Sequence, residues 1–277
     1  MNCVVKNNMR LLSSLLTLFL LCCIVSSEDL DARFDAAENA NDLVPLIESV
    51  SALLPTLPAD QALILTDRVA PYCQRLFWSP STAMGRERCG LISHIVAAGD
   101  TPIAIAKKYH TTVEMIARLN EKFAPTRLSI GQSLTVLDLA SQPLELAVSR
   151  SSFRLMAWRG PLLIGSFQCG LGRVQSPTPL GTSSITQCVR NPEWRDPDSG
   201  KIFKPNDPGN VLGGYWIGFD HGADLRFKGI GIHGFTAQSP DEWLGKNGSH
   251  GCVRLVQEDI AMIFALVRPG NKVTVRE

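Results

Sequence analysis

The chain from Leu144 onward consists of short apolar runs separated by turn-forming residues, and this pattern restricts the fold to one built on strands. Residues 144–170 contain two or three such runs, interrupted by Ser-Ser and by Arg-Gly-Pro. A Pro-Gly turn in residues 178–185 leads into another run, and residues 213–219 and 230–235 have the composition of buried strands. Short runs bounded by Gly, Pro and Ser are typical of β-strands. We therefore predict a mainly β domain.

Residues 191–210 interrupt these runs with four prolines and several aspartates. This composition predicts a long surface loop. Long loops in a compact β domain are often lids or binding walls, so we expect this one to border a site.

Residues 28–92 have a different periodicity. Apolar residues between 43 and 54 fall three and four positions apart until Pro55 and Pro58 interrupt them, and a second periodic stretch covers residues 63–76. This spacing predicts a small helical region. We interpret the region as a spacer whose apolar residues serve packing only.

The first 27 residues have the layout of a secretory signal. They contain Lys6 and Arg10, no acidic residue, then the apolar run 11–25 and two serines. A basic start, an apolar middle and small residues before a cleavage point define such a signal. We expect the mature protein to begin near Glu28. A signal retained as a membrane anchor is the alternative, although the run is short for a span.

The charge of the chain gives no reason to expect a nucleic-acid partner. The sequence has 27 Lys and Arg against 26 Asp and Glu. Loss of Lys6 and Arg10 with the signal leaves 25 basic and 26 acidic residues, a formal charge of −1. Nucleic-acid binding relies on a clear excess of positive charge, which is absent here.

Three of the eight cysteines lie within the first 27 residues, so five remain in the mature chain. An odd number in an exported chain leaves at least one thiol unpaired within it. Neighbours in sequence suggest that Cys73 pairs with Cys89 and that Cys169 pairs with Cys188. Cys252 is then the unpaired thiol.

Residues 94–138 show a compact β-α-α-β pattern. A strand is expected to begin at Ile95 and Val96, and Asp100 or Thr101 is expected to cap the first helix. A second helix starts at Thr111 or Thr112, and a returning strand closes the unit. The first helix is expected to bury Ile103, Ile105, Ala106 and Tyr109. The second helix is expected to run through Ile116 and Leu119, and the returning strand is expected to contain Ile130, Leu134 and Val136.

This segment resembles a lysin-motif (LysM) domain. The matching residues are Gly99-Asp100-Thr101, Ile105-Ala106-Lys107-Lys108-Tyr109, Asn120 and Ile130-Gly131-Gln132. The resemblance implies binding to glycans that contain N-acetylglucosamine, such as peptidoglycan or chitin. The segment departs from the family at Pro102, where a larger apolar residue is usual, and at His94, where an aromatic residue is usual.

Two short pieces near the C-terminus combine histidine and cysteine: GIHGF with His233, and SHGC with His250 and Cys252. A thiol becomes a good nucleophile when a neighbouring imidazole takes its proton. His233 is the better candidate for this base, because His250 is only two residues from Cys252 and has little room to rotate onto the sulfur. Gly251 suits the close approach of backbone N–H groups to a developing oxyanion. The pattern predicts acyl transfer through a thioester.

Three alternatives compete with this interpretation. His233, His250 and Cys252 supply three zinc ligands, but His221 is the only further histidine nearby, and the other cysteines lack paired spacing. A disulfide to Cys252 is allowed by the cysteine count. The third alternative is a buried cysteine with two core histidines.

The same pieces resemble the signature of the L,D-transpeptidase catalytic domain, over roughly residues 144–277. The resemblance is carried by His233-Gly234, Ser249-His250-Gly251-Cys252-Val253-Arg254, Thr178-Pro179-Leu180-Gly181 and Asn210-Val211-Leu212-Gly213. It implies that Cys252 is the nucleophile, that His233 is the general base, and that the Gly234 carbonyl orients the imidazole. It also implies oxyanion donors and a substrate-binding set. These are the amides of Gly251 and Cys252, and the side chains of Ser249, His250 and Arg254.

Together the two resemblances imply an exported enzyme of the bacterial cell wall that organises peptidoglycan and cell shape. Cys252 would attack the third residue of a tetrapeptide stem and release the terminal D-alanine, and an amine on another stem would resolve the thioester. The alternatives are an L,D-carboxypeptidase and a non-catalytic wall-binding protein.

The expected partners are stem peptides and glycan strands, with membrane contact only if the signal is retained. We expect a monomer in the periplasm or cell wall, without metal or organic cofactor. The predicted class is α+β and multidomain, with a sandwich-like catalytic domain. The predicted parts are a signal peptide (1–27), a helical region (28–92), a LysM domain (93–138) and an L,D-transpeptidase catalytic domain (144–277).

Overall fold

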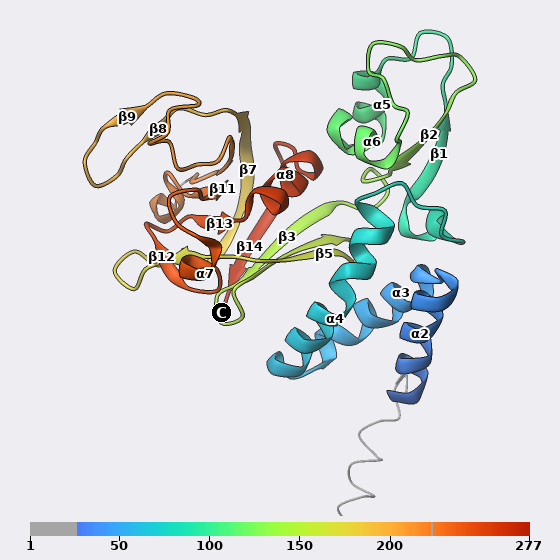
Figure 1. Ribbon diagram of the computed structural model, residues 1–277, viewed down its shortest axis with the longest axis horizontal. Helices are drawn as coiled ribbons and strands as arrows, with labels where there is room; N and C mark the ends of the chain where they lie inside the picture. Colours follow the sequence, from blue (N-terminus) through green and yellow to red (C-terminus); the bar gives the residue numbers. More distant parts are fainter. Residues whose placement is uncertain (1–26, 223) are drawn as a thin grey trace, which may run out of the picture.

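The computed structural model describes residues 27–222 and 224–277 of the 277 residues. A helical region, a small two-stranded unit with two helices, and a large sheet follow one another along the chain (Figure 1). The predicted α+β class is confirmed. Apart from its last residue, the predicted signal segment lies outside the described residues. In the described ranges, every helix is too short or too polar to cross a membrane.

The helical region consists of α2 (Ser27–Ala40), α3 (Leu43–Leu53), the 3-10 helix η1 (Leu54–Thr56) and α4 (Ala59–Phe77). The break between α3 and α4 coincides with the prolines, because Pro55 lies in η1 and Pro58 directly precedes α4. The apolar face of these helices is buried in the same core as the sheet, with Leu46, Ile47 and Val69 fully enclosed. The region is therefore packed into the same core as the sheet.

The helices also satisfy the backbone of strand β5 (Leu162–Gln168), which forms one edge of the large sheet. The amide of Leu163 donates to the hydroxyl of Ser51 at 3.0 Å, and its carbonyl accepts from the thiol of Cys73 at 3.6 Å. The indole of Trp78 donates to the carbonyl of Ile164 at 2.8 Å. An exposed sheet edge presents unpaired backbone groups, and these side chains pair them.

The LysM region contains the 3-10 helix η2 (Arg86–Cys89), β1 (Leu91–Ile95), α5 (Pro102–Lys108), α6 (Val113–Leu119) and β2 (Ser133–Leu137). Strands β1 and β2 pair antiparallel. Thr101 caps α5 by accepting from the amide of Ala104, and Thr112 caps α6 by accepting from the amide of Met115. Both threonines were among the expected caps.

Three details of this unit differ from the expectation. The first strand ends at Ile95, where the sequence suggested that it begins. Ile103 is 74% exposed, because it lies on the side of α5 away from the buried Ile105 and Ala106. Ile130 was expected in the returning strand, but it lies in the turn before β2, where it is 74% exposed.

Eight strands form one mixed sheet in the order β13-β11-β10-β7-β14-β3-β4-β5. The pairs β11–β13 and β3–β14 are parallel and the others are antiparallel, and β7 joins the half formed by β10, β11 and β13 to the half formed by β14, β3, β4 and β5. The strands not yet given are β3 (Leu144–Ser149), β4 (Arg154–Arg159), β6 (Leu171–Gly172), β7 (Gly181–Arg190), β8 (Trp194–Arg195), β9 (Ile202–Phe203), β10 (Tyr215–Phe219), β11 (Gly231–Gly234), β12 (Asn247–Ser249), β13 (Val253–Leu255) and β14 (Lys272–Arg276). The helices are η3 (Leu225–Phe227), α7 (Pro240–Trp243) and α8 (Gln257–Leu266).

The LysM region is seated on the sheet domain through α6 and α8, which lie side by side (Figure 1). The hydroxyl of Thr112 donates to the carbonyl of Ala265 in α8. Glu114 forms an ion pair with Arg190 of β7 at 3.6 Å. Met115 and Leu119 are buried in the core that the sheet and the helical region share. One core therefore joins all three parts.

The two predicted disulfides are wrong, because all five cysteines of the described chain are free thiols. Cys169 follows β5 at one edge of the sheet, whereas Cys188 lies on β7, with three strands between them. Cys73 and Cys89 are both fully buried, and the thiol of Cys73 bonds to the backbone of β5 instead of a second sulfur.

Candidate active site

Three neighbouring strands place Trp216, His233 and Arg254 side by side. Trp216 of β10 is the register partner of His233 of β11, and His233 is the partner of Arg254 of β13. Register partners project from the same face of a sheet, and so do residues two positions apart on one strand. Cys252 directly precedes β13 and comes two residues before Arg254, so continuing the strand alternation by one residue puts its thiol on the face that carries His233.

The imidazole of His233 is buried and fixed on two sides. Its Nδ1 donates to the carbonyl of Gly234, and its ring stacks on Trp216 with centroids 5.9 Å apart and planes inclined by 26°. A carbonyl only accepts, so Nδ1 carries the proton and Nε2 is left to accept one. Burial lowers the pKa of His233 to about 4, which the bond to Gly234 opposes and the charge of Arg254 reinforces. The ring is neutral at physiological pH.

The thiol of Cys252 is half-buried and donates to the carbonyl of Gly229 at 3.6 Å. Burial raises its pKa to about 11, while the amide of Gly231 and the charge of Arg254 lower it. Cys252 and His233 are therefore a neutral thiol and a neutral imidazole in the resting structure. A reaction at this sulfur would therefore require the thiol to lose its proton as the reaction proceeds, because a thiolate–imidazolium pair is absent at neutral pH.

The turn before Cys252 is held by Ser249, which is buried. Its hydroxyl donates to the carbonyl of Cys252 at 2.6 Å and accepts from the amide of Gly251 at 3.1 Å. Gly251 has a φ of +117°, and a Cβ at this position would lie 2.7 Å from Ile230. The turn therefore requires glycine here. The backbone amide of Gly251 was expected to bind an oxyanion, but here it donates to the hydroxyl of Ser249. It can bind an oxyanion only after this hydrogen bond breaks.

Arg254 places a cation beside the thiol without a carboxylate partner among the described residues. Its guanidinium carbon lies 3.7 Å from the ring centroid of Phe235, and its Nε is buried without a hydrogen bond in the described chain. Burial lowers the pKa of Arg254, and Cys252 opposes this effect. An unpaired cation at this position favours a thiolate.

His250 contacts the long loop that follows β7. Its Nε2 lies 2.8 Å from Oδ1 of Asp198, and Nη2 of Arg173 lies 3.9 Å from the same oxygen. The loop was expected to border a site. The sequence analysis did not include Asp198 or Arg173 in the site. The loop holds several aspartates, and nothing in the sequence distinguishes Asp198 from the others.

The two further motif pieces shape the surroundings of the thiol. The hydroxyl of Thr178 accepts from the amide of Gly172 at 2.9 Å, which fixes the segment before β7 against β6. The side-chain Nδ2 of Asn210 donates to the carbonyl of Pro192 at 2.8 Å, and its Oδ1 accepts from the backbone amide of Leu212 at 3.2 Å. Asn210 thus ties together the two ends of the long loop.

The zinc alternative lacks a ligand set. Within residues 27–222 and 224–277, no three His, Cys, Asp or Glu side chains are grouped so that they could hold a metal ion. His250 pairs with Asp198, while Nδ1 of His233 bonds to its neighbouring carbonyl. His221, the remaining candidate, is exposed and bonds to the carbonyl of Gly222 at 3.0 Å.

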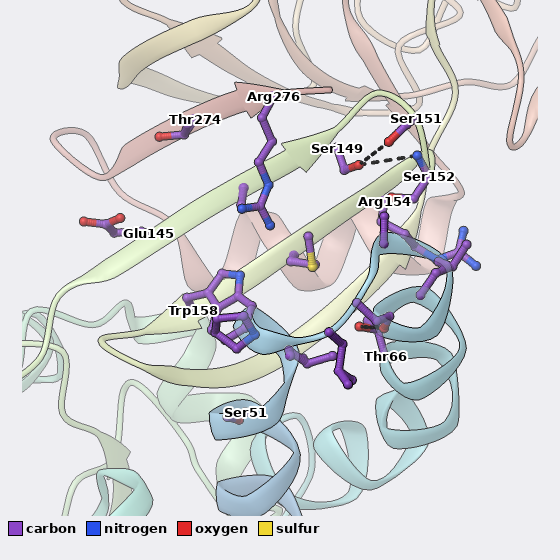
Figure 2. Close-up of a pocket in the computed structure, with 18 of the residues that line it drawn as sticks. Ser51, Thr66, Glu145, Ser149, Ser151, Ser152, Arg154, Trp158, Thr274 and Arg276 are labelled. Carbon is purple, nitrogen blue, oxygen red and sulfur yellow. Dashed lines mark hydrogen bonds between the residues drawn. The ribbon is translucent and has the colours of Figure 1, made fainter. Parts of the chain in front are cut away.

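A cavity of about 840 Å³ lies elsewhere, between the helical region and the strands β3, β4 and β14. Figure 2 shows Ser51 and Thr66 on the helical side and Trp158 and Arg276 on the strand side. None of the expected catalytic residues lines this cavity. The cavity is therefore separate from the predicted site.

Comparison with known proteins finds two families in the chain. The family model of the L,D-transpeptidase catalytic domain (YkuD) matches residues 144–275, and that of the LysM domain matches residues 94–136. Both resemblances seen in the sequence are thus confirmed.

Relatives are found among curated proteins and solved structures. YkuD of Bacillus licheniformis, named as an L,D-transpeptidase, is 24% identical over 188 residues, which are 67% of this chain and 99% of that protein. YqjB of Bacillus subtilis, named likewise, is 32% identical over 114 residues, 41% of this chain and 60% of that protein. A solved L,D-transpeptidase from Mycobacterium tuberculosis H37Rv is 21% identical with a TM-score of 0.39, and the match covers 54% of this chain and 64% of that one.

Proposed function

The chain carries an L,D-transpeptidase catalytic domain and a LysM domain, and we propose that it is an exported enzyme that cross-links peptidoglycan through a thioester on Cys252. The observation that carries this proposal is the placement of His233. Its Nδ1 is held by Gly234, so Nε2 is the acceptor on the sheet face to which Cys252 is directed. A nucleophile, a base and a group that orients the base are the parts required for covalent acyl transfer.

In the first half of the reaction, the sulfur of Cys252 attacks the carbonyl carbon of the third residue of a tetrapeptide stem. The thiol proton passes to Nε2 of His233 during the attack. The carbon–nitrogen bond to the terminal D-alanine then breaks, and His233 returns the proton to the departing amine. The products of this half are a thioester on Cys252 and free D-alanine.

In the second half, an amine of another stem attacks the thioester carbonyl. His233 takes a proton from this amine and delivers it to the sulfur as the carbon–sulfur bond breaks. The amide of Cys252 and the cation of Arg254 stabilise the negative charge that develops in both halves. Ser249 and Gly251 hold the turn that presents the thiol, and no step requires a metal or an organic cofactor.

The LysM domain serves the same substrate by binding glycan strands. Its two helices and two strands carry the motif residues, and Asn120 fixes α6 to β2 by donating to the carbonyl of Thr135 at 2.7 Å. His94, which stands at the usual aromatic position, bonds to Tyr109 at 3.0 Å and to Asp100 at 2.9 Å. We place the protein outside the cytoplasm, where peptidoglycan lies.

Incubation with a purified disaccharide-tetrapeptide, followed by mass analysis, tests the function. A cross-linked dimer together with free D-alanine is expected, and Cys252→Ala should give neither. Tripeptide without dimer would replace the proposal by an L,D-carboxypeptidase. Unchanged substrate with the wild-type protein would favour a non-catalytic wall-binding protein.

A further inference from the structure

Arg173 and His250 lie together at the mouth of the site because two short strands hold them there. β6 and β12 pair in parallel, and the amide of Arg173, just beyond β6, donates to the carbonyl of Ser249 at 2.8 Å. His250 follows Ser249 and precedes Cys252 by two residues. Two side chains that can carry positive charge are thus attached to the short segment that leads into Cys252, because His250 belongs to it and Arg173 is bonded to it at Ser249.

The tip of the β8–β9 hairpin delivers Asp198 to this pair. The turn is ordered by Asp196, whose carboxylate accepts from the amide of Asp198 at 3.1 Å and whose carbonyl accepts from the amide of Gly200 at 2.8 Å. The carboxylate of Asp198 reaches His250 at 2.8 Å across 52 positions of sequence. The hairpin contributes a carboxylate to the site from a distant part of the chain.

Asp198 forms a hydrogen bond with His250 but none with Arg173. The separation of 3.9 Å between Nη2 of Arg173 and Asp198 is an ion-pair distance, too long for a hydrogen bond. Nε of Arg173 is buried without a hydrogen-bond partner in the described chain. A guanidinium fork binds a carboxylate best through two N–H groups at once. A carboxylate seated deeper than Asp198 would use donors that this one does not.

We propose that Arg173 and His250 form a subsite for the C-terminal carboxylate of the donor stem, and that Asp198 occupies this subsite until substrate displaces it. This inference rests on the proposed function. In a tetrapeptide stem only one residue follows the bond that Cys252 attacks, so the terminal carboxylate lies about 4 Å or less from the reacting carbonyl. His250 is two residues from Cys252, and Arg173 is bonded through its amide to Ser249, three residues from Cys252, so both side chains start from backbone close to the thiol. Binding of the donor also releases the hairpin tip from the mouth of the site.

The displacement makes a prediction about affinity. A ligand that competes with an internal carboxylate can bind only the molecules in which the subsite is open. Its apparent Kd is therefore the intrinsic Kd divided by the open fraction. Removal of the carboxylate of Asp198 should therefore strengthen binding of a ligand with a free C-terminal carboxylate. It should leave a ligand that ends in a carboxamide unaffected.

The test measures binding by calorimetry in a Cys252→Ala background, in which turnover cannot interfere. The probes are the disaccharide-tetrapeptide and the same molecule with a C-terminal carboxamide. The acid is expected to bind about tenfold more tightly than the amide, and Asp198→Ala should widen this ratio several-fold by strengthening acid binding alone. Arg173→Gln should abolish the preference, and Arg173→Lys should restore part of it.

Hydrogen exchange supplies a second measurement, which would not change with ligand if Asp198 only stabilised the fold. Amides of residues 194–203 should exchange faster when the acid is bound and should not change with the amide. Equal binding of acid and amide, weaker acid binding in Asp198→Ala, or no binding of either probe would overturn the subsite. A preference for the acid in a protein that shows no turnover would instead overturn the proposed function and leave the subsite standing.

Discussion

The two ends of the large sheet are completed in opposite ways. At the β5 end, Ser51, Cys73 and Trp78 pair the backbone groups of the edge strand. At the β13 end, a glycine adopts a φ of +117° beside a thiol, and Arg254 has no carboxylate partner in the described chain. One end uses polar side chains to satisfy the fold. The other leaves polar groups unsatisfied, and this is where a substrate can be bound.

Cys73, which packs against the β5 end, and Cys252, at the β13 end, differ in the same way. Burial raises the pKa of both thiols, and both donate to a backbone carbonyl. Cys73 is 0% exposed and faces the edge strand, whereas Cys252 is half-buried and shares a face with an imidazole and a guanidinium. Accessibility and neighbours distinguish the packing thiol from the proposed nucleophile, because the pKa shift has the same sign in both.

Substitution at the β13 end should have the largest effect. Cys252→Ala and His233→Ala should each abolish acylation by a β-lactam of the carbapenem type, because nucleophile and base act as a unit and their losses are not additive. Mass spectrometry of the intact protein measures the adduct. Cys73→Ala is the matched control, with full labelling at Cys252. Labelling of Cys73 in the folded protein would erase the distinction between the two thiols.

His250→Ala should slow acylation without abolishing it, by a factor of about 100 to 1000, the range found for loss of one group that stabilises developing charge. The rate of adduct formation measures the effect. His221→Ala replaces an exposed histidine outside the site and should react at the wild-type rate. If His250→Ala is inactive while His233→Ala still acylates, the two histidines have exchanged roles.

The pKa of Cys252 predicts a rate that rises steadily with pH. Alkylation of Cys252 by iodoacetamide should increase about tenfold per unit and should not level off below about pH 11, because only the thiolate reacts. Arg254→Gln should lower the rate at any one pH, since loss of the cation raises the pKa of the thiol. Acylation assisted by His233 should fail only as the pH falls through about 4. A plateau near pH 8.5 would mean an unperturbed thiol.

Substitution at the β5 end should change stability and leave the chemistry intact. Ser51→Ala removes the acceptor of the buried Leu163 amide and should lower the free energy of unfolding by about 1–3 kcal/mol. Urea unfolding measures the loss, and carbapenem acylation should be unchanged. Ser49→Ala is the control, because that hydroxyl bonds to Pro45 within its own helix. Equal losses in both variants would show that pairing of the sheet edge contributes nothing.

The sequence supports the prediction of local features well. The strand runs after Leu144, the threonine caps of α5 and α6 and the interruption between α3 and α4 depend on neighbouring residues, and all are present. The motif around Cys252 was identifiable because its spacing is specific.

Contacts between distant segments could not be predicted. Asp198 meets His250 only because the β8–β9 hairpin brings it there. Three strands lie between Cys169 and Cys188, the cysteine nearest to it in sequence. The helical region was interpreted as a spacer because its apolar residues do not specify what they pack against. Its hydroxyl, thiol and indole groups act on β5, which begins more than 80 residues after Trp78.

The contact between α6 and α8 fixes how far the thiol can reach. Met115 and Leu119 share a core with the sheet, so the sugar-binding module and the thiol belong to one body instead of two bodies on a tether. A flexible tether samples many separations, whereas a folded junction permits one. If the LysM domain holds a glycan strand as proposed, only stems at a set position relative to the bound sugars come within reach of Cys252. The spacing of the cross-links would then be set by the distance between the LysM domain and Cys252.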